Sequence, residues 1–157
     1  MRNAVTFCCL LALALNFSLP QTAEAQEITP PAAPVLGFVQ QPAASRALQR
    51  FQKRPVSELS KLIYLVDRLG ETQVDVVYEK KSYSTQLVLP VARWYLNAHY
   101  NKKDSAENWL SKWCYRSLGS GETVWVKYQD GSLRAARDLL LEELDRLDSL
   151  CESNPGL

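Results

Sequence analysis

Residues 57–78 read SELSKLIYLVDRLGETQVDVVY, and the periodicity of this stretch changes midway. In its first part, apolar residues recur at the spacing of one helix face: Leu59, Leu62, Ile63, Val66 and Leu69. Ser57 is a favourable N-cap and Gly70 a favourable stop, so we expect a helix over about 57–69. Residues 73–78 then alternate and are rich in β-branched side chains, which predicts a strand.

The next segments repeat these patterns less clearly. Residues 79–82 are polar and predict a turn. Residues 85–100, TQLVLPVARWYLNAHY, leave two alternatives. Either a strand precedes a helix that opens at Pro90, or Ser84 caps one long helix that Pro90 kinks. In both cases Val91, Trp94, Tyr95, Ala98 and His99 share helical spacing.

The C-terminal third completes the fold prediction. A capping box with Asp104 or Ser105 at the cap predicts a helix to about 116, and residues 123–128, TVWVKY, alternate like a strand. Ser132 is placed to cap a last helix with a long apolar stripe: Leu133, Ala136, Leu140, Leu144, Leu147 and Cys151. The sequence therefore predicts a helix-dominated α+β domain with about four helices and a small two-stranded antiparallel ribbon.

The N-terminus has the three parts of a secretory signal peptide over residues 1–25. Arg2 supplies positive charge, residues 5–15 are almost wholly apolar, and Ala23-Glu24-Ala25 resembles a cleavage site. The apolar run is shorter than the ~20 residues of a comfortable membrane span. We expect an exported protein, periplasmic or secreted, that meets the membrane only through its signal peptide. A retained N-terminal anchor is the alternative.

Residues 26–55 hold five of the eight prolines and many Ala and Gln residues, which predicts a flexible segment. The globular domain is expected over 56–152, followed by a tail at 153–157. Residues 45–54 are more helical, and Leu48 and Phe51 could dock that turn on the domain. The same turn carries four bases and no acid, namely Arg46, Arg50, Lys53 and Arg54. They could contact phosphate or an anionic membrane, although a solvated face is the simpler interpretation.

Charge and composition exclude several functions. The chain has 157 residues, and 18 basic against 17 acidic side chains give a net charge of +1, so nothing attracts nucleic acid globally. A single His and four Cys are too few soft ligands for a zinc site, and we predict no metal and no cofactor. Cys114 and Cys151 remain after signal removal, and an even pair in an exported chain predicts a disulfide.

Catalytic patterns are equally sparse. Ser120 lies between two glycines, but Leu118 stands where a nucleophile elbow needs a glycine. His99 has no marked acidic partner for a triad. Four acids could serve a glycosidase only if the fold brought two of them together: Asp75, Glu79, Glu107 and Glu122. We therefore predict that the protein is not an enzyme.

Aromatic residues are the most unusual feature, since ten Trp and Tyr residues lie between positions 78 and 128. Helical phase predicts burial of four of them: Trp94, Trp109, Trp113 and Trp125. Exposed aromatic and arginine side chains are typical anchors for partners. The candidate binding residues are therefore Tyr95, Tyr100, Tyr115, Arg116, Ser120 and Tyr128. The partner expected is an envelope protein; binding or hydrolysis of a cell-wall glycan is the alternative.

Several motifs together resemble a known family. They are Tyr83 after a polar turn, Trp94-Tyr95-Leu96-x-x-x-Tyr100, Ala106-Glu107-x-Trp109-Leu110, the loop that starts Arg116-Ser117, and Val124-x-Val126-x-Tyr128. Over about 57–148 the chain resembles the YfeK-like family of small bacterial periplasmic proteins, a domain of unknown function. The resemblance implies an exported bacterial protein and supplies no catalytic residues. The family carries a cysteine on each of two strands, where this chain has Val74 and Tyr128.

Overall fold

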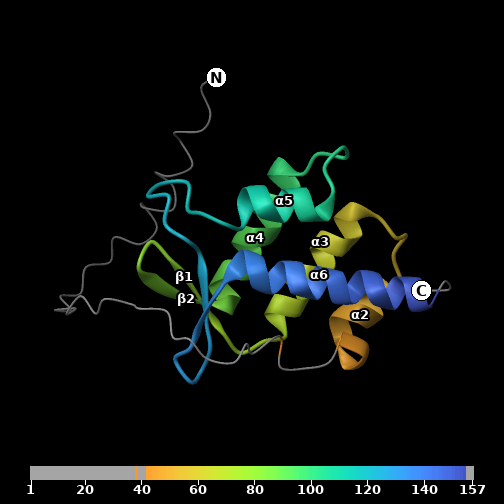
Figure 1. Ribbon diagram of the computed structural model, residues 1–157, viewed down its shortest axis with the longest axis horizontal. Coiled ribbons are helices and arrows are strands. Elements are labelled where there is room, and N and C mark those ends of the chain that lie inside the picture. Colours follow the sequence, from red (N-terminus) through yellow and green to blue (C-terminus); the bar gives the residue numbers. More distant parts are fainter. Residues whose placement is uncertain (1–37, 39–41, 155–157) are drawn as a thin grey trace.

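The computed structural model describes Phe38 and residues 42–154, and the predicted signal peptide lies outside them. The domain is α+β and dominated by helices, as predicted (Figure 1). Its elements, in chain order, are a 3₁₀ turn η1 (Pro42–Ala44), α2 (Arg46–Phe51), α3 (Glu58–Gly70), β1 (Asp75–Tyr78), β2 (Lys81–Ser84), α4 (Thr85–His99), α5 (Ala106–Trp113), β3 (Trp125–Lys127), β4 (Leu133–Ala135) and α6 (Ala136–Ser153).

The sheet has four antiparallel strands in the order β2-β1-β3-β4, with Val76 opposite Val126 at its centre. The predicted pairing of segments 73–78 and 123–128 is confirmed, but the ribbon of only two strands was wrong. β2 is short and largely exposed, so it carries no apolar alternation. A two-residue turn joins it to β1, with Glu79 and Lys80 both at positive φ, the geometry of a tight hairpin.

Local capping explains where most helices begin. The Ser57 and Ser60 side chains form a reciprocal capping box at α3, and Ser105 caps α5 by accepting a hydrogen bond from the Asn108 N–H. Ser132 does not cap α6, because residues 133–135 form β4 and the helix starts at Ala136. The α5 helix also ends at Trp113, earlier than predicted.

The α4 helix settles the alternative left open by the sequence. It runs without a break from Thr85 through Pro90 to His99, with Ser84 at the N-cap position. The Thr85 hydroxyl donates to the Val74 carbonyl and ties the helix start to the segment before β1. Further along α4, Leu89 packs against Gly70, the last residue of α3. A Cβ on Gly70 would lie 2.8 Å from Leu89 Cδ1, so the absent side chain permits this close helix approach.

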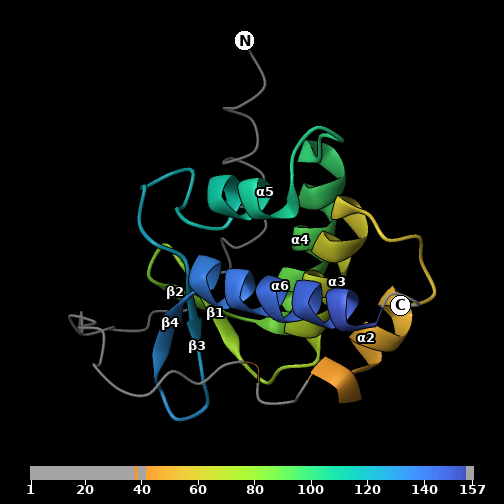
Figure 2. The same cartoon turned by 45° about the vertical axis from the view of Figure 1, so that its right-hand side comes forward.

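Two hydrophobic clusters fill the domain. The first joins α2, α3, α4, α5 and α6; the second lies between the sheet, α3 and α6 and includes Phe38. The sheet and α2 lie at opposite ends of the molecule, with α6 running between them across α3 (Figure 2). Ala47, Leu48 and Phe51 of α2 belong to the first cluster, so the folded domain extends N-terminally beyond the predicted boundary at residue 56.

Candidate binding surface

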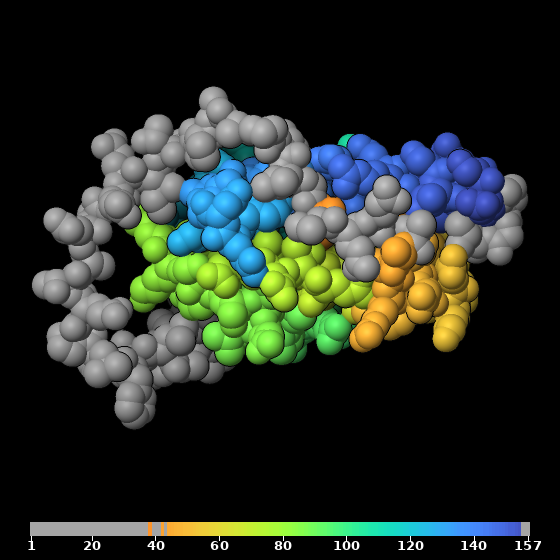
Figure 3. Space-filling model, turned by 90° about the horizontal axis from the view of Figure 1, so that it is seen from below, coloured from red at the N-terminus to blue at the C-terminus, as the bar shows by residue number. Residues whose placement is uncertain are grey.

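An exposed apolar ridge follows the outer face of α4. Leu87, Val91 and Trp94 have exposed fractions of 65%, 40% and 51%. Their i, i+4, i+7 spacing places them above one another on one side of the helix. We call these three residues the α4 stripe. Helix α4 lies along the face shown from below in Figure 3, where its residues are green.

The inner face of the same helix is apolar as well. Leu96 is 2% exposed and belongs to the first hydrophobic cluster, and Leu89, seven residues earlier, packs near Gly70. Leu87 and Leu96 are nine residues apart, which is two and a half turns at 3.6 residues per turn, so they lie on opposite sides of the helix. The α4 stripe therefore points directly away from the packed face. The sequence prediction that Trp94 is buried was wrong, because α4 is apolar on two sides and only one packs inward.

A group of aromatic rings in mutual contact lies along one flank of the stripe. The Tyr95 ring centroid is 4.3 Å from that of His99 and 5.4 Å from that of Trp113, and His99 and Trp113 are 5.0 Å apart. These three residues form what we call the aromatic flank. Partial burial raises the pKa of the Tyr95 hydroxyl to about 12, so the phenol stays neutral at physiological pH. Lys112, whose Nζ lies 5.0 Å from the Trp113 ring, brings a positive charge to this flank.

Arginines converge on the opposite flank. Arg93 of α4 donates to Asp67 Oδ1 at 2.9 Å, and Arg50 Nε of α2 donates to Asp67 Oδ2 at 3.1 Å. Arg54 lies 3.6 Å from the same Oδ2. Asp67 is 5% exposed, so one buried carboxylate organises three guanidinium groups from three chain segments. We call Arg50, Arg54 and Arg93 the arginine flank.

The loop at 114–124 collects three of the residues predicted to bind. The guanidinium carbons of Arg116 and Arg137 lie 4.9 and 4.2 Å from the Tyr115 ring, which is half-buried between them. Ser120 is exposed, and its hydroxyl lies 2.8 Å from that of Ser117. Ser117 in turn donates to Glu79 at 3.1 Å and fastens the loop to the β1–β2 turn. Tyr115 therefore already has cationic partners within the chain.

The other predicted residues lie elsewhere. Tyr95 belongs to the aromatic flank, and Tyr100 is half-buried against the first hydrophobic cluster. The prediction that Tyr128 is exposed was wrong, since its exposed fraction is 7%. Val124, Val126 and Tyr128 alternate along one face of the sheet, and that face packs in the second cluster. The six candidate residues thus do not form one surface.

Cys114 and Cys151 are free thiols in the structure, not the bridged pair that the sequence predicts. Both side chains are partly buried and pack against the first hydrophobic cluster. Burial raises the pKa of the Cys114 thiol to about 12 and also raises that of Cys151. Neither is therefore poised as a thiolate nucleophile.

Three of the four acids considered for catalysis have separate local partners. Asp75 accepts a hydrogen bond from Ser82, Glu79 accepts from Ser117, and Glu122 pairs with Lys80 at 3.3 Å. Within the described residues, no group of three or more His, Cys, Asp or Glu side chains could hold a metal ion. Over the same part of the chain, no helix combines the length and apolarity needed to cross a bilayer.

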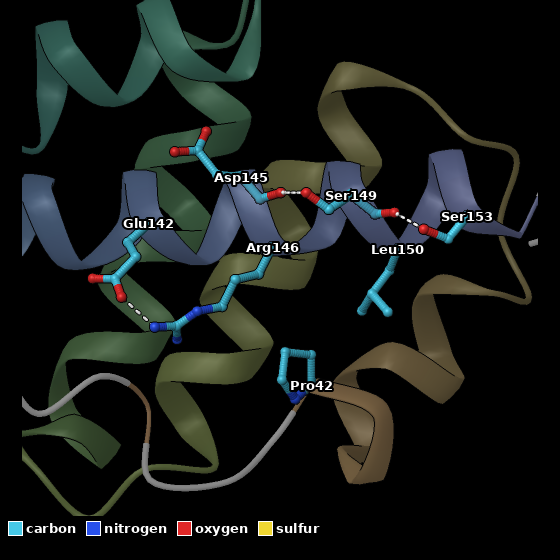
Figure 4. A pocket seen from close by; sticks show the side chains of 7 residues that line it. All are labelled: Pro42, Glu142, Asp145, Arg146, Ser149, Leu150 and Ser153. Atoms are coloured by element: carbon cyan, nitrogen blue, oxygen red, sulfur yellow. Dashed lines mark hydrogen bonds and ion pairs between the residues drawn. The ribbon is translucent and has the colours of Figure 1, made fainter.

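A shallow depression of ≈ 470 Å³ lies between Pro42 and the neighbouring face of α6 (Figure 4). Its lining alternates charge and apolar surface: Pro42, Glu142, Asp145, Arg146, Ser149, Leu150 and Ser153. Arg146 bonds to Glu142, and the Ser149 and Ser153 hydroxyls bond back to carbonyls of their own helix. These polar groups therefore satisfy one another and do not converge on a ligand position.

Sequence reasoning missed a buried charged group between α3 and α6. Glu143 Oε1 accepts from the Tyr64 hydroxyl at 2.6 Å and from Arg68 Nε at 2.7 Å, and all three side chains are at most 1% exposed. The only signal was that Tyr64 and Arg68 are spaced i, i+4 within the first predicted helix.

No family model, curated protein or solved structure matches this chain. The resemblance to the YfeK-like family thus stays a prediction. What the surface does must be argued from its geometry.

Proposed function

We propose that the protein is an exported, non-catalytic binding module that captures another envelope protein through the outer face of α4. The observation that carries this proposal is the α4 stripe. Three large apolar side chains in helical register are kept in solvent on the side opposite the packed face. Contiguous apolar residues on a surface mark sites of interaction more often than scattered ones do.

The shape of the stripe favours a protein partner. Residues at i, i+4 and i+7 form a ridge, and ridges pack into the grooves of another helix. Trp94 supplies the kind of aromatic anchor that dominates interface energetics. Three partly exposed side chains bury much less than the ~800 Å² per partner of a standard interface, so a partner must also cover at least one flank.

The experiment is photo-crosslinking in the native host. Val91 is replaced by p-benzoyl-phenylalanine, and Gln129, exposed in the β3–β4 turn, is replaced in a matched strain. We expect a discrete protein adduct at position 91 and none at position 129. The adduct should fall at least tenfold with Leu87→Ala plus Trp94→Ala, since interface anchors cost about 1–4 kcal/mol each.

Tyr115→Ala with Arg116→Ala provides the comparison with the surface first predicted. Tyr115 is already held between Arg116 and Arg137, so we expect this pair to leave the adduct at position 91 unchanged. Circular dichroism of each purified variant verifies the fold. An adduct that depends on Tyr115 and Arg116 but not on Leu87 and Trp94 would contradict the proposal.

Binding of a cell-wall glycan is a second candidate, favoured by the exposed Trp94 beside Tyr95, whose ring centroids lie 6.5 Å apart. Aromatic rings in the open are suited to stack on sugars. Cosedimentation with purified peptidoglycan, lost on Trp94→Ala and accompanied by no protein adduct at position 91, would assign the surface to glycan.

A further inference from the structure

We infer that the partner segment that covers the α4 stripe is acidic, and that its carboxylates bind the arginine flank. This inference rests on the proposed function and specifies its partner. Three observations carry it: the number of guanidinium groups around Asp67, their fixed positions, and their place beside the stripe.

Positive charge exceeds negative charge at this flank. Arg50, Arg54 and Arg93 meet Asp67, and the second acid, Glu71, contacts Arg50 at 3.3 Å. Three cations against two anions leave a surplus of one positive charge, and Glu71 is also shared with Arg68 at 3.6 Å. Lys53 and Arg46, both exposed on α2 or just after it, add to the field. Helix α2 carries no acid that could offset them.

The guanidinium groups are held in place and still reach solvent. The Arg93 and Arg50 side chains are 57% and 48% exposed although each donates to Asp67. A guanidinium has five N–H donors, so each keeps several for another acceptor. The Arg54 side chain is 34% exposed and its Nη1 atom is buried, so it offers less to a partner than Arg50 and Arg93 do. Donors that are already oriented lose little entropy when a carboxylate binds them.

The flank and the stripe belong to one surface. Arg93 lies about 100° around the α4 axis from Trp94, on the side of the helix that faces Asp67 of α3, and Asn97 lies one turn further along that side. A partner that covers Leu87, Val91 and Trp94 and also the side of α4 towards α3 would therefore reach Arg93. Carboxylates at that edge match both the sign and the forked geometry of the arginines.

A membrane surface is the competing occupant, and the same features disfavour it. Segments that bind anionic lipid carry clusters of four to eight basic residues, and their charge attracts them to the membrane surface without a fixed geometry. Here the arginines around Asp67 are tied to acids of the chain. Fixed, bidentate donors favour the planar carboxylate of a protein.

The test uses p-benzoyl-phenylalanine in place of Val91 on the stripe and of Asn97 on the arginine side, in the full-length protein in its host. The crosslinked peptide is identified by mass spectrometry. We expect both positions to label one segment, with apolar residues at helical spacing and at least two Asp or Glu residues within a turn of the label at position 97.

A synthetic peptide of the labelled segment then tests the charges. We expect it to bind the purified protein at least tenfold more tightly than the same peptide with Asn and Gln in place of Asp and Glu. Arg50→Gln with Arg93→Gln should remove that difference, whereas Lys127→Gln, an exposed cation on β3, should preserve it.

The outcomes separate the two proposals. A protein adduct at position 91 whose segment lacks acids, or equal binding of both peptides, overturns the acidic partner and leaves the proposed function standing. Absence of any protein adduct at positions 91 and 97 overturns both. Cosedimentation with phosphatidylglycerol vesicles that is lost in Leu87→Ala and in Arg93→Gln would assign the surface to a membrane and overturn this inference.

Discussion

Two regions of the molecule invert the usual distribution of side chains. The contact between α3 and α6 buries charged residues, and the outer face of α4 exposes apolar ones. Inside the first, Arg68 and Glu143 are almost completely excluded from solvent. On the second, Leu87 is 65% exposed. Charged residues are normally kept in water, and large apolar ones are normally buried when they are contiguous.

The difference lies in how each region is compensated. Glu143 receives hydrogen bonds from Tyr64 and Arg68, and Arg146 lies 3.5 Å from its second oxygen. The buried charge is thus matched by groups of the same chain. Leu87 and Val91 remain in solvent, with no comparable cover from the described part of the chain. The buried charges are thus explained within the chain, whereas the exposed apolar residues are the ones that we propose a partner covers.

The largest effect is expected from Glu143→Gln. The substitution removes the nearer counter-charge of the buried Arg68 and leaves only Glu71 at 3.6 Å, and breaking a buried pair costs about 3–5 kcal/mol. Urea unfolding followed by circular dichroism measures the loss. Asp145→Asn, an exposed acid two residues along α6, is the matched control and should change stability by less than about 0.5 kcal/mol.

Glu143→Gln could prevent folding, so a second variant tests the same idea. Replacing both charges, with Arg68→Met and Glu143→Leu, removes the unpaired ion and should recover most of the lost stability. A double variant that is no more stable than Glu143→Gln alone would show that the pair does not act through charge compensation.

A smaller effect should separate the two faces of α4. Leu96→Ala empties a site that is 2% exposed and is expected to cost about 2–5 kcal/mol, as buried leucines do. Leu87→Ala is the matched change on the outer face, and we expect less than about 0.5 kcal/mol. The free energy of unfolding in urea gives both values. A cost above 1 kcal/mol for Leu87→Ala would mean that the α4 stripe stabilises the isolated domain, which would weaken its assignment as a binding surface.

How much of this could be read from the sequence depends on how local each feature is. The helix starting after Ser57, the β1–β3 pairing and the class of fold follow from capping residues and periodicity, which act within a few positions. β4 was missed because Leu133 also fits the stripe of the following helix, and three residues are too few to show alternation.

The candidate site was predicted less well, for a physical reason. The spacing of Val91 and Trp94 was visible in the sequence, yet α4 has apolar residues on two faces, and periodicity alone does not say which face packs inward. Likewise, Arg50 and Arg93 are 43 positions apart (93 minus 50) and meet only because both bind Asp67. Such convergence depends on tertiary packing.

The free energy of unfolding should depend modestly on pH through the Cys114 thiol. The Cys114 pKa rises from 9.0 to about 12 on folding because burial disfavours the thiolate. The unfolded chain therefore releases this proton first, so the stability contributed is complete below pH 9 and is lost as pH rises from 9 towards 12. Tyr64, whose pKa is raised by burial and by Glu143, acts in the same direction at higher pH.

Urea midpoints between pH 7 and pH 10 measure this dependence. We expect the Cys114→Ala variant to lose about 1 kcal/mol less than the parent protein over that range. Comparing the change with pH, and not the absolute stability, cancels the cost of the smaller side chain. An identical pH dependence in the two proteins would show that the Cys114 thiol ionises freely in the folded state.

The smallest effect concerns a rate and leaves stability untouched. Because the thiolate is the reactive form, iodoacetamide at pH 8 should modify Cys114 at least tenfold more slowly than a thiol in the unfolded chain, with Cys151 less protected. Mass spectrometry after timed quenching locates each label, and guanidinium without reductant supplies the unfolded control. If that control takes up no label until a reductant is added, Cys114 and Cys151 are bridged in the protein from its host, as the sequence predicts. We expect two labels in the unfolded control and slow labelling only at Cys114 in the folded protein. That result would show that Cys114 is protected by the hydrophobic core and does not belong to the proposed binding surface.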